Sequence, residues 1–254
     1  MLSVLRRIVL RELTKAYKLG VDISISRVIR VFNLNSSLTY KFVKELESEG
    51  IVESTKRGWW RLRDNSRARS LAEFILSQPV ESAFYKYFPE VVPETYYYIA
   101  ELPIQEWFGV KGYDLVIVDK RLKGRLNPPP RYKVVYTSLR GRSWRYDESF
   151  GASIGTLEQS LADLLSYDPL YPIELFLVNN LYRVDLDETA RRCTPEGLRR
   201  LASFIAFYSL AVGKLIPSKT RFLRLVDNEE ILSRVFTNTI TWIYANDVDV
   251  RRNI

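Results

Sequence analysis

Side chains suited to binding nucleic acid are concentrated between residues 36 and 44. Hydroxyl and phenol groups donate to and accept from base edges, and lysine ammonium groups neutralise phosphates. The candidates are Ser36, Ser37, Tyr40, Lys41 and Lys44. On a helix, their spacing places them on one face or at its N-terminal end. The pattern therefore predicts a surface that reads duplex DNA.

Four further cations suit the phosphate backbone rather than the bases. Lys56 and Arg57 precede Gly58, and this sequence predicts a turn with a basic tip. Arg6 and Arg7 lie between apolar residues near the N-terminus. A basic hairpin tip suits the DNA backbone or the minor groove. We expect all four cations to bind phosphates.

Three helices must position these side chains. Apolar residues at three-to-four spacing predict a first helix that ends before Gly20 and a short second helix capped by Ser24. Asn33 suits the tight turn that follows, and the side chain of Leu34 is expected to be buried as a plug beneath this turn. A third helix then ends at Gly50. Its expected buried stripe is Thr39, Phe42, Val43 and Leu46.

A hairpin completes the first 63 residues. Ile51 and Val52 predict a short strand, and residues 59–62 predict the returning strand, with at least one of Trp59 and Trp60 packing in the core. The order helix, helix, tight turn, helix, basic hairpin is that of a winged helix-turn-helix, whose third helix enters the major groove. Residues 1–63 hold 13 Lys and Arg against 6 Asp and Glu. This local net charge of +7 favours DNA binding.

The remainder of the chain predicts a linker and a second domain. Residues 64–70 are polar and fit a hinge. Residues 71–254 are expected to form a mixed domain, with a small β-sheet followed by a helical bundle. The whole chain is therefore expected to be an α+β protein with an N-terminal winged helix-turn-helix.

The pattern of apolar residues identifies the secondary structure of some segments of the second domain more clearly than that of others. Residues 94–102 fit either a strand or a short helix. Strands are expected at residues 113–118 and 132–139, and short helical segments at 71–77 and 104–108. Further helices are expected at 157–166, 172–182, 187–193, from 194 onward, and at 229–244.

A second basic stretch lies within this second domain. Residues 111–145 hold 10 Lys and Arg against 2 Asp and Glu, whereas residues 146–250 hold 10 against 15. The part from 120 to 131 is rich in proline and fits no regular element. The residues of this second basic patch are Lys120, Arg121, Lys123, Arg125, Arg140 and Arg142.

Several phrases of the chain are similar to those of known regulators. Leu46 to Val52 resembles the end of the recognition helix in prokaryotic winged-helix regulators. Tyr98-Ile99, Phe108-Gly109, the two strands that follow, and the phrase from Ala152 to Leu165 resemble the C-terminal domain of AbiEi-type antitoxins of type IV toxin–antitoxin systems.

This resemblance implies a function for both domains. Such proteins repress their own operon through the winged helix, and their C-terminal domain counteracts a partner nucleotidyltransferase toxin. A positive surface on that domain contributes to the antitoxin activity. The counterpart here is the basic stretch, chiefly Lys120, Arg121, Lys123 and Arg125.

The composition excludes several classes of enzyme. The chain has no histidine and a single cysteine, Cys193, so it lacks the imidazole base of Ser-His-Asp and Cys-His systems and the ligands of common zinc sites. Residues 151–156 lack the Gly-Lys-Ser/Thr ending of a P-loop and are expected to form a turn. Asp114 and Asp119 fall on opposite faces of a strand. We therefore expect no catalytic residue, no cofactor and no metal.

The absence of long apolar segments bears on the location of the protein. No stretch reaches the roughly 20 apolar residues that a membrane helix requires, and the charged N-terminal segment is unlike a signal peptide. One cysteine fits a reducing compartment. We expect a cytoplasmic protein without a membrane partner.

The sequence predicts a sequence-specific DNA-binding transcriptional regulator that is not an enzyme, and by resemblance an autoregulating antitoxin. Its expected partners are double-stranded DNA and a cognate nucleotidyltransferase-type toxin. The alternative is a nucleic-acid-binding or protein-interaction module, associated with RNA, replication or ribosomes, without repressor activity. The sequence leaves the oligomeric state open.

Overall fold

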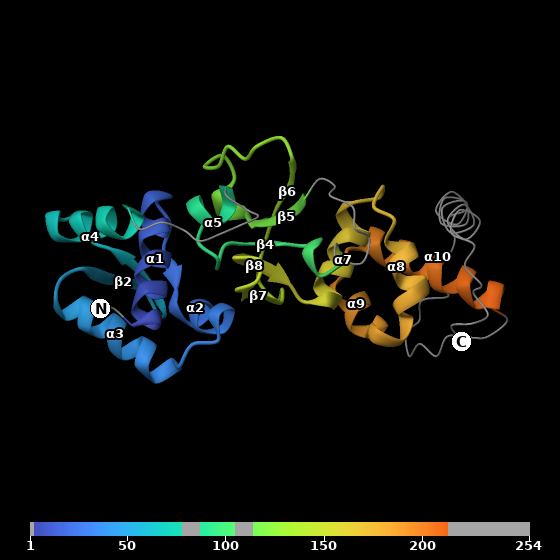
Figure 1. The fold of residues 1–254 in the computed structure, drawn as a ribbon, viewed down its shortest axis with the longest axis horizontal. Helices are drawn as coiled ribbons and strands as arrows, with labels where there is room; N and C mark the ends of the chain where they lie inside the picture. The colour runs from blue at the N-terminus through green and yellow to red at the C-terminus, as the bar shows by residue number, and fades with distance from the viewer. Residues whose placement is uncertain (1–2, 78–86, 105–113, 213–254) are drawn as a thin grey trace. The chain divides into compact units, whose positions relative to one another are not determined.

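The chain forms two compact units, each built from two stretches of sequence. The computed structural model describes residues 3–77, 87–104 and 114–212 (Figure 1). Unit 1 comprises Met1–Ile99 and Val116–Ile154, and unit 2 comprises Ala100–Leu115 and Gly155–Ile254. The boundary expected at residues 64–70 does not coincide with this division. The described residues contain helices and two small sheets, which agrees with the α+β class.

Unit 1 begins with helices α1 (Val4–Lys18), α2 (Ile25–Phe32) and α3 (Ser36–Ser48). Two of them have side-chain caps, since Ser3 accepts from the amide of Arg6 and Asn35 from that of Leu38. Asn33 ends α2 in the left-handed region, at φ 50°, as a tight turn requires. The first and third helices thus agree with the sequence prediction.

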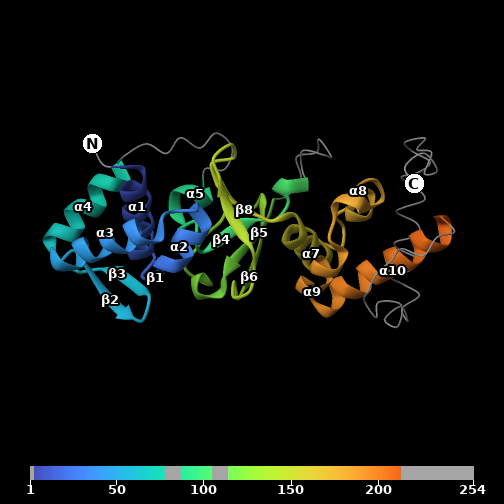
Figure 2. The same cartoon turned by 90° about the horizontal axis from the view of Figure 1, so that it is seen from below.

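A three-stranded antiparallel sheet follows these helices. Its strands are β1 (Ile23–Ser24), β2 (Val52–Lys56) and β3 (Trp59–Leu62), in the order β1-β3-β2. In Figure 2 the β2–β3 hairpin projects from the helices of unit 1. The inward face of the sheet is apolar: Val52 pairs with Leu62, Ile23 pairs with Trp60, and all four are buried. This face closes the core beneath α1.

The expected linker is mostly helical. Helix α4 (Ser66–Ser77) begins within it and contacts α1. Asn65 caps this helix by accepting from the amide of Ala68 at 2.9 Å and donates to the carbonyl of Gly50 at 2.9 Å. Ala68, Ala72 and Ile75 are buried at helical spacing. The polar composition of residues 64–70 therefore reflects the exposed face of a helix rather than a hinge.

A five-stranded sheet carries the rest of unit 1. Its order is β6-β5-β4-β8-β7, with β4 antiparallel to β5 and parallel to β8. The short helix α5 (Tyr87–Val91) precedes it. The strands are β4 (Tyr97–Ile99), β5 (Asp114–Asp119), β6 (Tyr132–Thr137), β7 (Trp144–Asp147) and β8 (Ala152–Gly155). The strands expected near 113–118 and 132–139 are confirmed, and the ambiguous segment 94–102 contains a strand.

Two expectations in this region are wrong. The segment 151–156 is not simply a turn, because β8 occupies most of it and is buried on both faces. A strand that is covered on both faces lacks the alternation of apolar and polar residues that identifies a strand in a sequence. The two glycines of this segment therefore favoured a turn. The stretch 120–131 begins with a short 3₁₀ helix, η1 (Lys120–Leu122), which follows β5 directly.

The described part of unit 2 after β8, residues 157–212, is helical, as expected. Helix α7 contacts α8, α9 and α10, and its residues Leu161, Leu164 and Leu165 are buried. The elements are α7 (Leu157–Tyr167), α8 (Ile173–Asn180), η2 (Leu181–Arg183), α9 (Leu186–Arg192) and α10 (Pro195–Val212). The expected helix at 229–244 and most of the segment 104–108 lie outside the described residues. Within the described residues, no helix is both long and apolar enough to span a membrane.

Candidate nucleic-acid interface

Helix α3 buries one face and exposes a mainly polar face opposite to it. The four residues of the predicted stripe are buried against the rest of unit 1. The five candidate contact residues on the other side are all exposed: Ser36, Ser37, Tyr40, Lys41 and Lys44. Leu38, which the sequence analysis missed, is 58% exposed beside them. A leucine side chain on this surface suits the methyl group of thymine.

The turn before α3 fixes the direction of this helix. The hydroxyl of Thr39 donates to the carbonyl of Asn35 at 2.7 Å, and the amide of Leu34 donates to the carbonyl of Ile29 at 2.9 Å. Leu34 is half-buried rather than the fully buried plug that was expected. These bonds hold the N-terminal end of α3, with its hydroxyl residues, at the surface of unit 1.

The hairpin turn presents its two cations to solvent. Lys56 and Arg57 are exposed, and Gly58 takes the positive φ of 76° that the turn requires. The ammonium group of Lys56 lies 4.5 Å from the centre of the Trp59 ring. The neighbouring Trp60 is buried, which confirms that one of the two tryptophans packs in the core.

The two α1 arginines have different surroundings. Arg6 forms an ion pair with Glu45 of α3 at 3.0 Å and lies 4.9 Å from the centre of the Phe42 ring. This contact joins α1 to α3. Arg7 is exposed. Lys44 forms a similar surface pair with Glu47 at 2.7 Å, which is worth little in water and is readily exchanged for a phosphate.

Among the described residues, the second basic patch divides into cations whose side chains bond within the fold and cations whose side chains do not. Lys120, Lys123 and Arg140 are exposed. Arg125 donates to the carbonyls of Leu19 and Gly20, at 2.5 and 2.8 Å, where α1 ends. Arg142 donates to the hydroxyl of Tyr98 at 2.8 Å and to the carbonyl of Ser138 at 3.2 Å. These two arginines therefore hold backbone and side chains in place.

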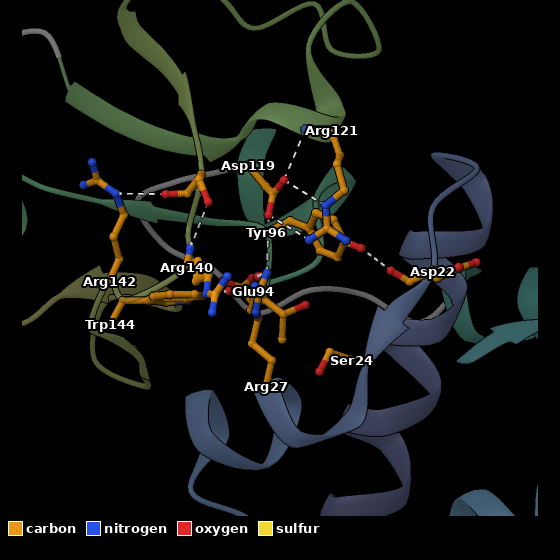
Figure 3. A network of polar contacts seen from close by, with 12 residues as sticks. Asp22, Ser24, Arg27, Glu94, Tyr96, Asp119, Arg121, Arg140, Arg142 and Trp144 are labelled. Carbon is orange, nitrogen blue, oxygen red and sulfur yellow. Dashed lines mark hydrogen bonds and ion pairs between the residues drawn. The ribbon is translucent and has the colours of Figure 1, made fainter. Parts of the chain in front are cut away.

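Arg121 belongs to a partly buried ionic cluster that sequence analysis did not find. Its guanidinium binds both carboxylate oxygens of Asp119, at 2.9 and 2.8 Å, and Arg27 of α2 lies 3.4 Å from the second oxygen (Figure 3). The hydroxyl of Tyr96 donates to the carbonyl of Asp22 beside them. The cluster connects α2 and the start of β1 to the end of β5.

The charges of this cluster are mutually stabilised. Burial alone would raise the pKa of Asp119, but its hydrogen bonds and charge interactions with Arg121, aided by the charge of Arg27, outweigh burial and leave that pKa below its ordinary value. Burial lowers the pKa of Arg27, an effect that the charge of Asp119 opposes. Asp119 is therefore ionised and holds two cations at the side of the β-hairpin.

A second buried network attaches α1 to the five-stranded sheet. The Glu12 carboxylate accepts from the amides of Glu94 and Thr95 at 2.9 and 3.2 Å. Lys15 lies 3.6 Å from the Glu94 carboxylate, which accepts from the amide of Ser153 at 2.9 Å. Burial, opposed by Lys15, raises the pKa of Glu12 to about 7. A pocket of about 160 Å³ opens beside Glu12, Lys15 and Glu94.

Two polar residues of the phrase from 152 to 165, Gln159 and Asp163, bond within unit 2. Gln159 donates to Asp163 at 3.1 Å and accepts from Arg192 at 3.0 Å, and both α7 residues are buried. Burial raises the pKa of the Cys193 thiol to about 12, so this half-buried group is a poor nucleophile. Among the described residues, no cluster of three acidic or cysteine side chains has the geometry to hold a metal ion.

Comparison of the chain with protein-family models, with curated proteins and with solved structures finds no match. The candidate interface therefore stands on its own geometry: an exposed polar face on α3, a basic hairpin turn, and exposed lysines that follow β5.

Proposed function

We propose that unit 1 contains a winged helix-turn-helix and that the protein binds duplex DNA as a transcriptional regulator. In this proposal α3 is the recognition helix, and the β2–β3 hairpin is the wing. The element order α1-β1-α2-α3-β2-β3 and the strand order β1-β3-β2 support this assignment. A recognition helix places its exposed side chains against base edges in the major groove.

One observation carries the proposal. Helix α3 buries its whole apolar stripe and exposes Ser36, Ser37, Tyr40, Lys41 and Lys44 together. The exposed face combines groups that hydrogen-bond to bases with groups that neutralise phosphates. The acidic residues nearest to it, Glu45 and Glu47, are each paired with a cation. The face is therefore suited to a polyanion.

The proposal is tested by measuring how salt affects the binding of the full-length chain to a 40-base-pair duplex of random sequence. Replacing Lys41 and Lys44 by glutamine removes two phosphate contacts. Because each contact contributes about 0.9 to the logarithmic salt slope, the slope should fall by roughly 1.8. Circular dichroism and a melting curve establish that the variant is folded.

Two comparisons make this test specific. Arg183→Gln with Arg199→Gln removes the same charge from exposed sites in unit 2 and should leave the slope unchanged. Ser37→Ala with Tyr40→Phe should change which duplexes are selected from a random library while preserving the salt slope, since base contacts carry the sequence information. Unchanged binding by the Lys41 and Lys44 variant would refute the proposal.

Autoregulation as an antitoxin is the finer form of this proposal. Its support is the resemblance of residues 152–165 to AbiEi-type antitoxins, together with the basic stretch 111–145. Purification of the tagged full-length chain from its native cell distinguishes the alternatives. A nucleotidyltransferase partner supports the antitoxin role, whereas RNA, ribosomal or replication proteins would support a nucleic-acid-binding or protein-interaction module without repressor activity.

A further inference from the structure

The indole of Trp59 lies at the meeting point of cations from different elements. Lys56 of the hairpin lies 4.5 Å from its ring centre, and Arg121 of η1 lies 4.6 Å from it. Arg27 of α2 lies at 5.9 Å. The segment after β5 is therefore in direct contact with the base of the hairpin, although more than 60 residues separate them in sequence.

Trp59 belongs to the outer face of the hairpin. Successive side chains of a strand point to opposite faces, and Trp60 is buried on the face that covers the helices. Trp59 is half-buried, and the Arg121 guanidinium lies between its ring and that of Tyr96, 4.7 Å from the latter. The outer face of the hairpin is thus covered in part by η1.

The position of η1 is fixed by contacts at both ends. At its start, Asp119 accepts from the amide and the guanidinium of Arg121 and lies near Arg27. Beyond its end, Arg125 donates to the carbonyls of Leu19 and Gly20. The hairpin is joined to the same region, because Thr55 donates to Asp22 at 2.8 Å. These bonds hold η1 beside the hairpin.

Two exposed lysines project from this fixed segment. Lys120 and Lys123 flank Arg121 within a single 3₁₀ turn, which advances about 2 Å per residue. Neither lysine has an ion pair among the described residues. Asp119, the acidic residue next to them, is already bound by two arginines. The ammonium groups of both lysines are therefore available to bind an anionic partner.

We propose that Lys120 and Lys123 extend the DNA-binding surface of the hairpin by contacting phosphates beyond those reached by Lys56 and Arg57. This inference rests on the proposed DNA-binding function and adds a second contact segment to it. A lysine ammonium group is a flexible point charge, which suits phosphates of the DNA backbone better than the edges of the bases. The segment would add affinity and a wider footprint but little sequence selectivity.

Continuity with the hairpin favours DNA over an acidic protein as the partner. The hairpin turn contributes the exposed cations Lys56 and Arg57, and the exposed Lys120 and Lys123 lie at the two ends of η1, which contacts Trp59 through Arg121. Exposed cations on two segments in contact suit the repeated phosphates of a duplex. An acidic protein partner remains as a distinct outcome of the experiment.

The experiment measures the salt dependence of binding by full-length Lys120→Gln with Lys123→Gln, using the same 40-base-pair random duplex. Loss of two phosphate contacts should lower the logarithmic salt slope by roughly 1.8. The control Arg183→Gln with Arg199→Gln loses the same charge and should retain the wild-type slope. Melting curves should be unchanged, because both lysines are exposed.

Hydroxyl-radical footprinting locates the contact on a duplex that the wild-type chain selects from a random library. The Lys120 and Lys123 variant should lose protection at the edge of the footprint and keep it at the centre. A wild-type slope and footprint for this variant, together with weaker binding by the Lys41 and Lys44 variant, would reject the extension and retain the proposed function. Loss of binding to an acidic protein partner alone would also reject it.

Failure of the proposed function has a different signature. In that case the Lys41 and Lys44 variant binds the random duplex as the wild type does, and no duplex is enriched from the library. The two hypotheses are therefore separated by which pair of lysines, on α3 or around η1, changes the slope.

Discussion

Arginines and lysines of the segment 120–125 have different surroundings because their side chains differ in shape. Arg121 and Arg125 bind a fixed carboxylate and two fixed carbonyls, whereas Lys120 and Lys123 are exposed. A planar guanidinium presents several donors in fixed directions, while an ammonium group is a hydrated point charge on a flexible stem. Residue type thus separates the cations that hold the fold from those open to a partner.

Asp119 gives a prediction at this scale. Asp119→Asn should destabilise unit 1 by about 3 kcal/mol, because removing one partner of a buried pair leaves Arg27 and Arg121 without a compensating charge. Urea unfolding monitored by tryptophan fluorescence measures the change. The matched control Asp64→Asn removes an exposed partner of Arg69 and should barely move the midpoint. Equal effects of the two substitutions would contradict the role of the cluster.

Glu12 gives a prediction about pH. Its pKa rises from 4.5 to about 7 on folding, so between these values the folded chain binds a proton that the unfolded chain has released. Stability should therefore fall as pH rises through this window, by about 3 kcal/mol in total. Lys15 and Glu94 are the charged groups that face Glu12.

The Glu12→Gln variant isolates this effect. Its lost hydrogen bonds lower stability by an amount that does not depend on the ionisation of residue 12. The stability of the wild type relative to this variant should therefore decrease between pH 5 and pH 7.5. Urea unfolding curves of both chains at each pH provide the measurement. A difference that stays constant or grows with pH is incompatible with a raised pKa.

At the scale of elements, packing of α10 on α7 depends on a glycine. A Cβ atom added at Gly197 would lie 2.3 Å from Oγ of Ser166 and 3.0 Å from its backbone nitrogen and Cα, so Ser166 would have to move. The hydroxyl of Ser166 also accepts from the amide of Thr194 at 3.0 Å. The two helices therefore approach each other closely at Gly197.

Gly197→Ala should destabilise unit 2 by about 2 kcal/mol, because the backbone of α7 must move away from the added methyl group. The gain in helix propensity from glycine to alanine, about 1 kcal/mol, opposes this loss. Thermal unfolding monitored by circular dichroism measures the balance. Glu196→Ala, at the exposed neighbouring position, is the control and should change little. A more stable Gly197→Ala variant would mean that α7 and α10 are not in close contact.

Elements whose own residues alternate between buried and exposed positions could be predicted from the sequence. Elements whose burial depends on contacts with residues far away in the sequence could not. The exposed face of α3 follows from the helical period of its own apolar residues, so its contact residues could be named from sequence. Strand β8 is buried on both faces and pairs with β4, about 50 residues earlier in the sequence, and nothing in residues 152–155 shows this. The helix expected at 71–77 is confirmed as part of α4, but its start at Ser66 was missed because arginines cover the exposed side of its first turn.

The buried networks were unpredictable for the same reason. Glu12 bonds to residues 94 and 95, and Arg27 pairs with Asp119, more than 80 positions away in each case. Sequence patterns report the spacing of neighbours, whereas a buried ion pair depends on how elements fold together. Arg121 and Asp119 lie only two positions apart, and it is the pairing of Asp119 with the distant Arg27 that makes them part of a partly buried cluster.

At the scale of the whole molecule, charge is unevenly distributed along the chain. The net charge of +8 arises mainly from two basic stretches, 1–63 and 111–145, offset by acidic stretches at 64–110 and 146–250. The basic stretches supply α3, the hairpin and η1 to the same unit. Long-range attraction to DNA would therefore be concentrated on unit 1, and it should weaken steeply as salt is added.

The discontinuous sequence of unit 1 has a consequence for its synthesis. Helix α1 leaves the ribosome early, but the partners of Glu12 and Lys15 are residues 92–95, about 80 positions later. Strand β4 can pair with its parallel neighbour β8 only after β8 has left the ribosome. At about 5 to 20 residues per second, the nascent helix bears uncompensated charges on its future buried side for several seconds. Until then, unit 1 lacks the contacts that neutralise these charges and cannot complete its fold.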